Sequence, residues 1–437
     1  MIKKSWIGAI PFLLWLFLYG YISAAELKSK WFIRSKCPSS VVVFPGIKEG
    51  DTSIWIPQYL LSDFRTYILK VEAGTGKVSE RFLIKTNFGK LIGFYGKVFT
   101  KSGFLILPCY VKNYLWEYPP PMLAFWNIKE RKMKVILSTF GHIYNSIDIG
   151  ENILCLWTTS NEIFLIKVIG DEIYIRKFVT YSPFPSLSLE GKIYQILREG
   201  FIERIVGGNK NGLLLLSKKS SYPHETILVK IEIKGHIWLP QKWLKLGEGM
   251  WVTYTSANKN KMEGYYLNEA GVLKILDLQV LKIKMERQIF KRKIQIIDAI
   301  SCDDREKIIT VISYPKVEQL ELGEGKLTAE TYSLPYLVVI DLKTFQIEWS
   351  LPIKGEIRKP ALSAKGGKVF FWVYNREKAK SYLYGVDIEK KKVLFCEETN
   401  NVYGTVPPLV IGSTLITLWK PSEGSKEQEG YKAFEIP

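Results

Sequence analysis

The stretch that decides the fold is Tyr336-Leu-Val-Val-Ile-Asp-Leu-Lys-Thr-Phe-Gln-Ile-Glu-Trp349. A run of β-branched and aromatic residues leads into a polar Asp-Leu-Lys-Thr segment, after which an apolar alternation resumes and ends on tryptophan. Because β-branched residues favour strands and Asp and Thr favour turns, the stretch predicts two antiparallel strands joined by a tight turn.

The same outline recurs along the chain. Tyr382–Phe395 and Tyr67–Phe82 follow it closely, and looser versions occur elsewhere. The eight copies begin near Tyr67, Met122, Ile163, Ile227, Gly264, Tyr336, Tyr382 and Gly430. The spacing between the starts of successive copies leaves room for about four strands, which is typical of one blade of a β-propeller.

A second pattern alternates with the first and consists of an apolar pair, a short spacer with glycine, and further alternating apolar residues. It predicts strand–turn–strand hairpins at Asn145–Trp157, Pro185–Leu197, Trp243–Tyr254, Pro360–Trp372 and Pro408–Trp419. We therefore expect an all-β chain, a single β-propeller of about eight four-stranded blades over residues 26–437, with seven blades as the alternative.

Asp341, Thr344 and Trp349 resemble the pyrroloquinoline-quinone-like (PQQ-like) repeat, and Asp387 begins a weaker copy. The resemblance implies that the Asp and Thr fasten the turn between successive blades and that the aromatic residue docks between neighbouring blades. Phe345 stands where the repeat has glycine. The chain looks like the degenerate, non-enzymatic branch of this family, which includes the periplasmic propeller subunit of outer-membrane protein assembly.

Tryptophans recur at positions that suit packing between blades. We expect inter-blade core positions, each burying side-chain area worth roughly 2–3 kcal/mol, at Trp157, Trp251, Trp349, Trp372 and Trp419.

The first 25 residues resemble a secretory signal peptide. Lys3 and Lys4 precede an uncharged apolar run, and Ser23-Ala24-Ala25 supplies small residues for cleavage. The alternative is an uncleaved membrane tether, because about twenty apolar residues can span a bilayer. Either reading places the propeller outside the cytoplasm, in the periplasm, at the cell surface or secreted.

The chain carries a net charge of +18, and part of that excess gathers in residues 281–296, with six Lys/Arg and one Glu. This segment fits one side of a helix or an edge strand. It supplies candidate partner-surface residues, namely Lys282, Lys284, Arg287, Lys291, Arg292 and Lys293. The following stretch, Pro315–Leu334, reads as a long polar loop.

A second candidate surface is aromatic. Tyr114, Trp116 and Tyr118 alternate just before three prolines, so an extended backbone would place them on one side as a platform. Packing on the propeller rim is the alternative.

Sequence motifs for chemistry are scarce. The three histidines lack metal-ligand spacing, and the chain contains neither a Cys-Cys pair nor a Gly-x-Ser-x-Gly motif. Ser146–Gly150 resembles a single partial Asp-box, for which a hairpin turn is the simpler interpretation. We therefore expect no catalytic residue, metal or cofactor, and no nucleic-acid partner.

These features predict an exported, non-enzymatic propeller that binds a protein partner or an anionic envelope component as a scaffold. The alternative is a propeller-fold enzyme, either a quinone-dependent dehydrogenase or a carbohydrate-active hydrolase. The oligomeric state stays open.

Overall fold

The computed structural model describes residues 28–34, 53–60, 65–84, 90–94, 99–112, 120–149, 152–179, 200–209, 212–219, 226–234, 237–254, 263–302, 306–322, 325–332, 334–355, 362–375, 378, 380–400, 408–419 and 430–437. The expected signal peptide, the aromatic platform and the hairpin at Pro185–Leu197 lie outside these residues. Within them the chain forms strands and turns and no helix, so none that could cross a membrane.

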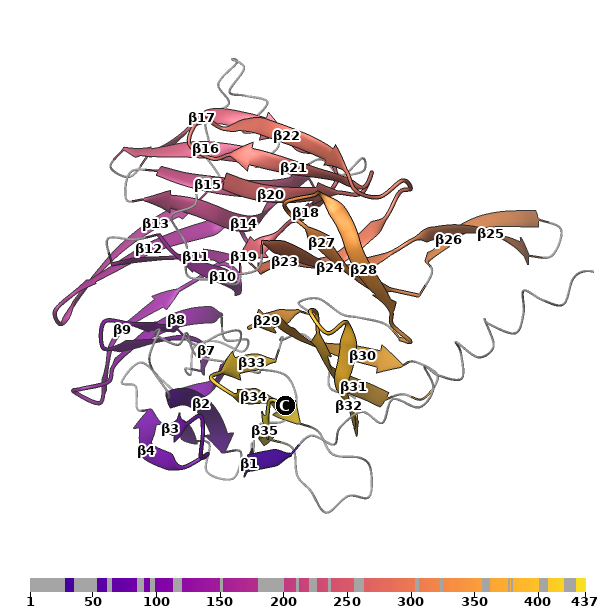
Figure 1. Ribbon diagram of the computed structural model, residues 1–437. Helices are drawn as coiled ribbons and strands as arrows, with labels where there is room; N and C mark the ends of the chain where they lie inside the picture. Colours follow the sequence, from indigo (N-terminus) through magenta and orange to yellow (C-terminus); the bar gives the residue numbers. More distant parts are fainter. Residues whose placement is uncertain are drawn as a thin grey trace, which may run out of the picture.

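Strands group into antiparallel sheets that follow one another along the chain, and we number these sheets as blades (Figure 1). Blade 1 holds β2 (Ser53–Leu60), β3 (Arg65–Glu72) and β4 (Val78–Ile84). Blade 2 holds β5 (Lys90–Phe94), β6 (Phe99–Lys101), β7 (Phe104–Lys112), β8 (Pro121–Asn127) and β9 (Lys132–Ser138). Blade 3 holds β10 (Ile143–Asp148), β11 (Ile153–Thr158), β12 (Glu162–Ile169) and β13 (Glu172–Val179). Blade 4 holds β14 (Gly200–Asn209), β15 (Gly212–Lys219), β16 (Thr226–Lys234) and β17 (Ile237–Lys245).

The second half of the chain repeats this arrangement. Blade 5 holds β18 (Gly249–Trp251), β20 (Glu263–Asn268), β21 (Val272–Asp277) and β22 (Lys282–Gln288). Blade 6 holds β23 (Gln295–Cys302), β24 (Lys307–Ser313), β27 (Tyr336–Asp341) and β28 (Gln346–Pro352). Blade 7 holds β29 (Ser363–Lys365), β30 (Lys368–Asn375), β31 (Lys380–Asp387) and β32 (Lys392–Asn400). Blade 8 holds β33 (Leu409–Ile411), β34 (Thr414–Trp419), β35 (Gly430–Glu435) and β1 (Ser29–Arg34).

The first and the last described strands meet in blade 8. The amino-terminal strand β1 pairs antiparallel with β35, so the first strand completes the last sheet, and indigo β1 lies beside yellow β35 in Figure 1. Eight blades thus close into a ring, which confirms the eight-bladed propeller and excludes the seven-bladed alternative.

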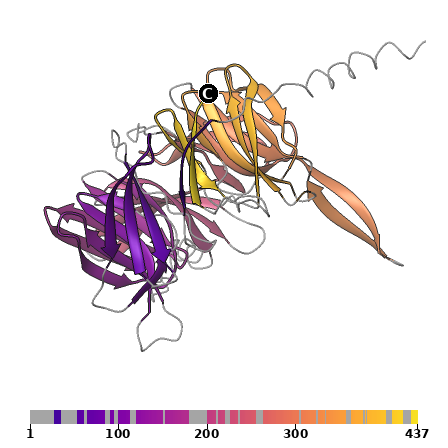
Figure 2. The ribbon, with the colours of Figure 1, turned by 90° about the horizontal axis from the view of Figure 1, so that it is seen from below.

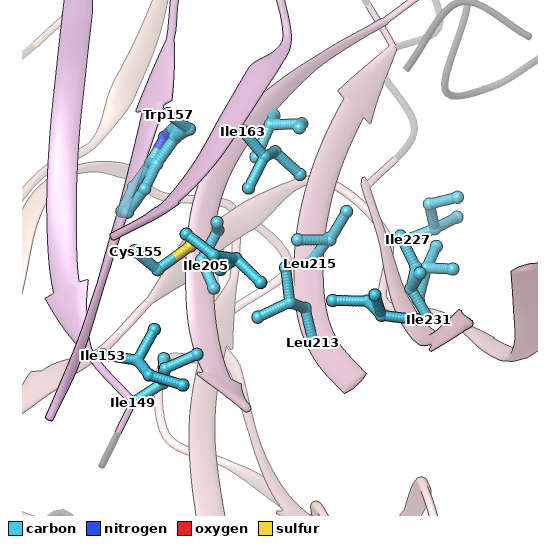
Figure 3. Close-up of a cluster of buried hydrophobic side chains, with 14 residues drawn as sticks. Ile149, Ile153, Cys155, Trp157, Ile163, Ile205, Leu213, Leu215, Ile227 and Ile231 are labelled. Carbon is cyan, nitrogen blue, oxygen red and sulfur yellow. The ribbon is translucent and has the colours of Figure 1, made fainter. Parts of the chain in front are cut away.

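The apolar core is divided among the blade interfaces. Along β8, Met122, Ala124 and Trp126 pack towards blade 1, whereas Leu123 and Phe125 pack towards blade 3. Successive strand residues point to opposite faces of a sheet, so each blade supplies apolar side chains to both neighbours. Eight buried clusters result, one for each pair of successive blades, and Figure 3 shows the cluster between blades 3 and 4.

Six of the eight predicted repeat copies fall on the third strand of their blade, namely β8, β12, β16, β27, β31 and β35, and the copy at Tyr67 falls on β3, the middle one of the three described strands of blade 1. The copy at Gly264 falls on the second strand of blade 5, and the third strand there is β21. The pattern therefore located every blade but placed the copy of blade 5 on the wrong strand.

Two further expectations are wrong. Trp243–Tyr254 is not a hairpin, because β17 and β18 belong to successive blades. The chain then forms β19 (Thr253–Tyr254), which pairs parallel with β23 of blade 6. Pro315–Leu334 is not a loop: it contains β25 (Pro315–Leu322) and β26 (Gly325–Tyr332), a hairpin that projects from the ring (Figures 1 and 2).

Candidate partner-binding surfaces

The order of antiparallel strands divides the chain connections between two faces of the ring. Turns from the first to the second strand and from the third to the fourth lie at one end, which we call the turn face. Connections from the second to the third strand, and from one blade to the next, lie at the other end, the loop face. Function in propellers gathers where connections converge, so each candidate residue is placed by face.

On the turn face, Asp341 organises the turn between β27 and β28. Its Oδ1 accepts hydrogen bonds from the backbone N–H groups of Lys343, at 2.7 Å, and Thr344, at 2.9 Å. These donors, the Thr344 N–H foremost, hold the pKa of the Asp341 carboxyl below its ordinary value. The turn joins two strands of one blade, so the expectation that Asp341 and Thr344 fasten a turn between successive blades is wrong.

This turn geometry recurs on other blades. Asp277 and Asp387 each accept two backbone N–H groups in the same way, and Asn127 accepts one. Four residues after the first turn residue, the backbone has positive φ, at Gly76, Arg131, Leu281, Phe345 and Lys391. The sequence analysis missed the Asp277 turn, which lacks both the threonine and the glycine of the repeat.

Trp349 joins blade 6 to blade 7. Its Nε1–H donates to the carbonyl oxygen of Ile388, which follows Asp387 in the equivalent turn, at 3.0 Å. Trp31 of β1 makes the same contact with Ala73 of blade 1, at 2.9 Å. The aromatic position of the repeat thus contacts the next blade, and Trp31 is a copy that the sequence analysis did not identify.

The remaining repeat tryptophans lie in the clusters between blades. Their exposed fractions are 1% for Trp157, 3% for Trp251, 4% for Trp372 and 6% for Trp419. Burial of this kind gives these side chains a packing role in the ring.

The candidate basic residues lie on and after β22, and we call Lys282, Lys284, Arg287, Lys291, Arg292 and Lys293 the basic edge. All six are exposed, and β22 is the outermost strand of blade 5, with its outer side unpaired among the described strands. The segment is therefore an edge strand as far as Gln288 rather than a helix.

Lys284 and Arg287 of the basic edge interact with other residues of the chain. Lys284 pairs with Glu263, which raises the pKa of Lys284, and the Arg287 guanidinium lies 5.9 Å from the centroid of the Phe345 ring. Lys282, Lys291 and Arg292 carry the part of the positive charge that is open to another molecule.

The innermost strands line the centre of the ring and carry a few charges. Lys101 of blade 2 pairs with Asp148 of blade 3, with an Nζ–Oδ2 distance of 2.8 Å. Asp298 of β23 accepts the backbone N–H of Leu362 in blade 7, at 2.9 Å. These carboxylates link neighbouring blades. Among the described residues, no group of three or more His, Cys, Asp or Glu could hold a metal ion.

In the connection between β9 and β10 the sequence analysis considered only His142, one of the three histidines, yet this part of the loop face carries the most exposed large apolar side chain of the described chain, Phe140, at 74%. Only its place in a short connection between blades could have drawn attention to it, because a single phenylalanine in a turn has no distinctive pattern.

No family model and no curated protein matches the chain. Among solved structures, the Dos1 propeller shares 9% identity and a TM-score of 0.56, covering 94% of this chain and 95% of that one. Quinohemoprotein alcohol dehydrogenase from Comamonas testosteroni shares 10% identity and a TM-score of 0.53, covering 95% and 77%. BamB from Moraxella catarrhalis shares 8% identity and a TM-score of 0.49, covering 94% and 100%. At these identities the likeness shows the propeller fold alone.

Proposed function

We propose that the chain is an exported, non-enzymatic β-propeller of the PQQ-like repeat type that binds a protein partner as a scaffold at the cell envelope. The observation that carries this proposal is the basic edge. Lys282, Lys291 and Arg292 are exposed on and beside an outer strand, where an acidic protein surface or an anionic envelope component can approach. The aromatic segment with Tyr114, Trp116 and Tyr118 is proposed as a second contact.

The test is cross-linking in living cells, with partners identified by mass spectrometry. We expect one protein to be recovered with the wild type and to be reduced at least several-fold with the triple variant Lys282→Glu, Lys291→Glu, Arg292→Glu. The control reverses the exposed lysines Lys390, Lys391 and Lys392 at the turn face of blade 7, with the same change of net charge. Equal recovery from both triple variants would show that the basic edge is not the binding surface.

The enzyme alternative has one observation in its favour. Glu203 lies on the innermost strand β14, and its buried Oε2 has no hydrogen-bond partner among the described residues. A carboxylate oxygen placed in this way could serve a ligand in the centre of the ring. A quinone absorption band in the purified protein, or oxidation of alcohols or sugars by it, would favour the enzyme over the scaffold.

A further inference from the structure

Phe140 projects from the loop face between blades 2 and 3. Its side chain is 74% exposed, against 56% for Leu334, the next most exposed large apolar residue of the described chain. Single exposed apolar residues are common on protein surfaces and need no explanation by themselves. The contacts that surround Phe140, in contrast, do require an explanation.

The backbone that carries Phe140 is held on both sides. The N–H groups of Phe140 and Gly141 donate to Oε2 of Glu162, at 2.6 Å and 3.3 Å, and Ser160 Oγ donates to the Phe140 carbonyl oxygen, at 3.3 Å. A Cβ at Gly141 would lie 2.5 Å from Ser160 Oγ, so the connection is seated against the turn before β12. Phe140 is therefore held in one position.

The group that fixes the backbone of Phe140 is the buried carboxylate of Glu162. The Glu162 side chain is fully buried, and its Oε1 lies 2.6 Å from Nζ of Lys177. The same ammonium group lies 4.4 Å from the centroid of the Phe140 ring, so a cation–π contact orients the ring as well as its backbone. Burial of the Glu162 carboxylate carries a desolvation cost, which Lys177, itself 35% exposed, and the two backbone N–H groups offset.

The same turn is also bonded to blade 4. Asn161, next to Glu162, accepts the backbone N–H of Ile202 in blade 4, at 2.8 Å. One turn of blade 3 is therefore hydrogen-bonded to the backbone of both neighbouring blades, which makes the seat of Phe140 part of the ring rather than of a separate loop.

We propose that Phe140 is the anchor of a docking surface on the loop face, beside Lys177. The partner is a protein with an apolar pocket for the ring and acidic side chains around it. A rigid aromatic side chain loses little conformational freedom on binding, and such anchors dominate the energetics of protein interfaces. The acidic rim follows from the net charge of +18, since Lys177 itself is already paired with Glu162. This proposal rests on the proposed scaffold function and assigns its partner a second, separate contact.

The test places the photo-cross-linking amino acid p-benzoylphenylalanine at position 140 of the full-length protein in cells. Ile169 is the matched control position, because it is 53% exposed and ends β12, the strand that Glu162 begins, so it lies on the opposite face of the same blade. The captured protein is identified by mass spectrometry and purified. Its dissociation constant is then measured by calorimetry with the wild type, Phe140→Ala and Ile169→Ala.

We expect an adduct from position 140 with a partner that chemical cross-linking also finds. Its dissociation constant should rise about ten-fold or more with Phe140→Ala and less than about two-fold with Ile169→Ala. The melting temperature of Phe140→Ala should match that of the wild type, because the side chain is mostly in water. A partner that binds Phe140→Ala as tightly as the wild type overturns the anchor and leaves the scaffold function standing. If neither cross-linking method captures a partner, both proposals fail.

Discussion

At the scale of single residues, the turn between the third and fourth strands is the most repeated device of this protein. An acidic or amide side chain accepts backbone N–H groups at its start, and a residue of positive φ ends it. The left-handed region costs a non-glycine residue roughly 1–2 kcal/mol, so glycine is the easy choice there. Among the five turns described above, only one has a glycine at the position of positive φ, Gly76. The other four place a strained non-glycine residue there, namely Arg131, Leu281, Phe345 and Lys391.

The first prediction concerns Lys391, an exposed residue with φ of +52° that forms an ion pair with Glu348, at 3.6 Å, near the surface. Lys391→Gly should raise the free energy of unfolding by about 1 kcal/mol, because relief of strain exceeds the small value of a surface pair. Phe345→Gly is the contrasting variant. Phe345 packs against the cluster between blades 5 and 6. The loss of this packing should offset the relief of backbone strain, so the free energy of unfolding should not rise. Urea denaturation of both variants measures the difference, and destabilisation by Lys391→Gly would contradict it.

Asp341 gives a prediction that depends on pH. Asp341→Asn should destabilise the protein by about 1 kcal/mol at pH 7, because the amide oxygen can still accept hydrogen bonds but has lost the charge. The pKa of the carboxyl is lowered in the folded state, so its stabilisation is complete above the unfolded value of 3.8. It is lost as the pH falls through the lower folded pKa.

Unfolding midpoints of the wild type and Asp341→Asn should therefore converge below about pH 4 and stay separate at pH 7. Glu389→Gln, an exposed change in the equivalent turn of blade 7, serves as the control for charge alone. A difference between the two proteins that is constant across this range would show that the carboxylate charge contributes nothing.

At the scale of elements, the strand pattern was predictable because blades repeat one order: an apolar strand buried on both faces, a polar turn and a more exposed fourth strand. Tyr336–Trp349 contains the third strand and the turn of a blade in full and the fourth strand as far as Trp349, and six of the eight copies fall on the third strand of their blade. The copy in blade 5 was misplaced because Asp277-Leu-Gln-Val-Leu281 keeps the turn geometry without the residues that mark it.

The hairpin β25–β26 and the contacts of Phe140 were not predictable in the same way. The polar residues of Pro315–Tyr332 suit an exposed ribbon as well as a loop. The burial of Glu162 depends on a connection from another blade, which no local pattern shows. The sequence therefore predicts most of the strands but not the contacts between residues of different blades.

Deletion of β1 and replacement of the β25–β26 hairpin should have different effects on the stability of the ring. Removal of residues 28–34 takes away β1 and exposes β35, together with the apolar side chains that Trp31 covers. Replacement of β25–β26 by a short glycine–serine turn removes strands that pair only with each other. We expect the first variant to lose its cooperative thermal transition and the second to melt within a few degrees of the wild type. Similar melting of the two would mean that the ring does not depend on its closing strand.

At the scale of the whole molecule, buried thiols report on opening of the ring. Cys109, Cys155 and Cys302 lie in three different blade interfaces and are almost fully buried. Burial raises the pKa of Cys109 to about 12, so its thiol stays protonated and unreactive at pH 8. Each cysteine can react only when its interface opens.

We expect the three cysteines to react with iodoacetamide at one common rate in moderate denaturant, because a closed ring opens as a unit. In the variant without β1, Cys109 should react first, since blade 1 borders the broken seam. Mass spectrometry of the labelled peptides gives each rate separately. Three different rates in the wild type would indicate blades that open independently.

The pairing of β1 with β35 also orders events during synthesis. The ribosome makes β1 long before β35, so β1 stays without its partner strand while the strands of blades 1 to 7 are made. Contacts this distant in sequence form slowly, and an unpaired strand edge is prone to aggregation. The ring therefore closes only after β35 has been made, and a chain that stalls before β35 would leave every earlier blade in an open arc.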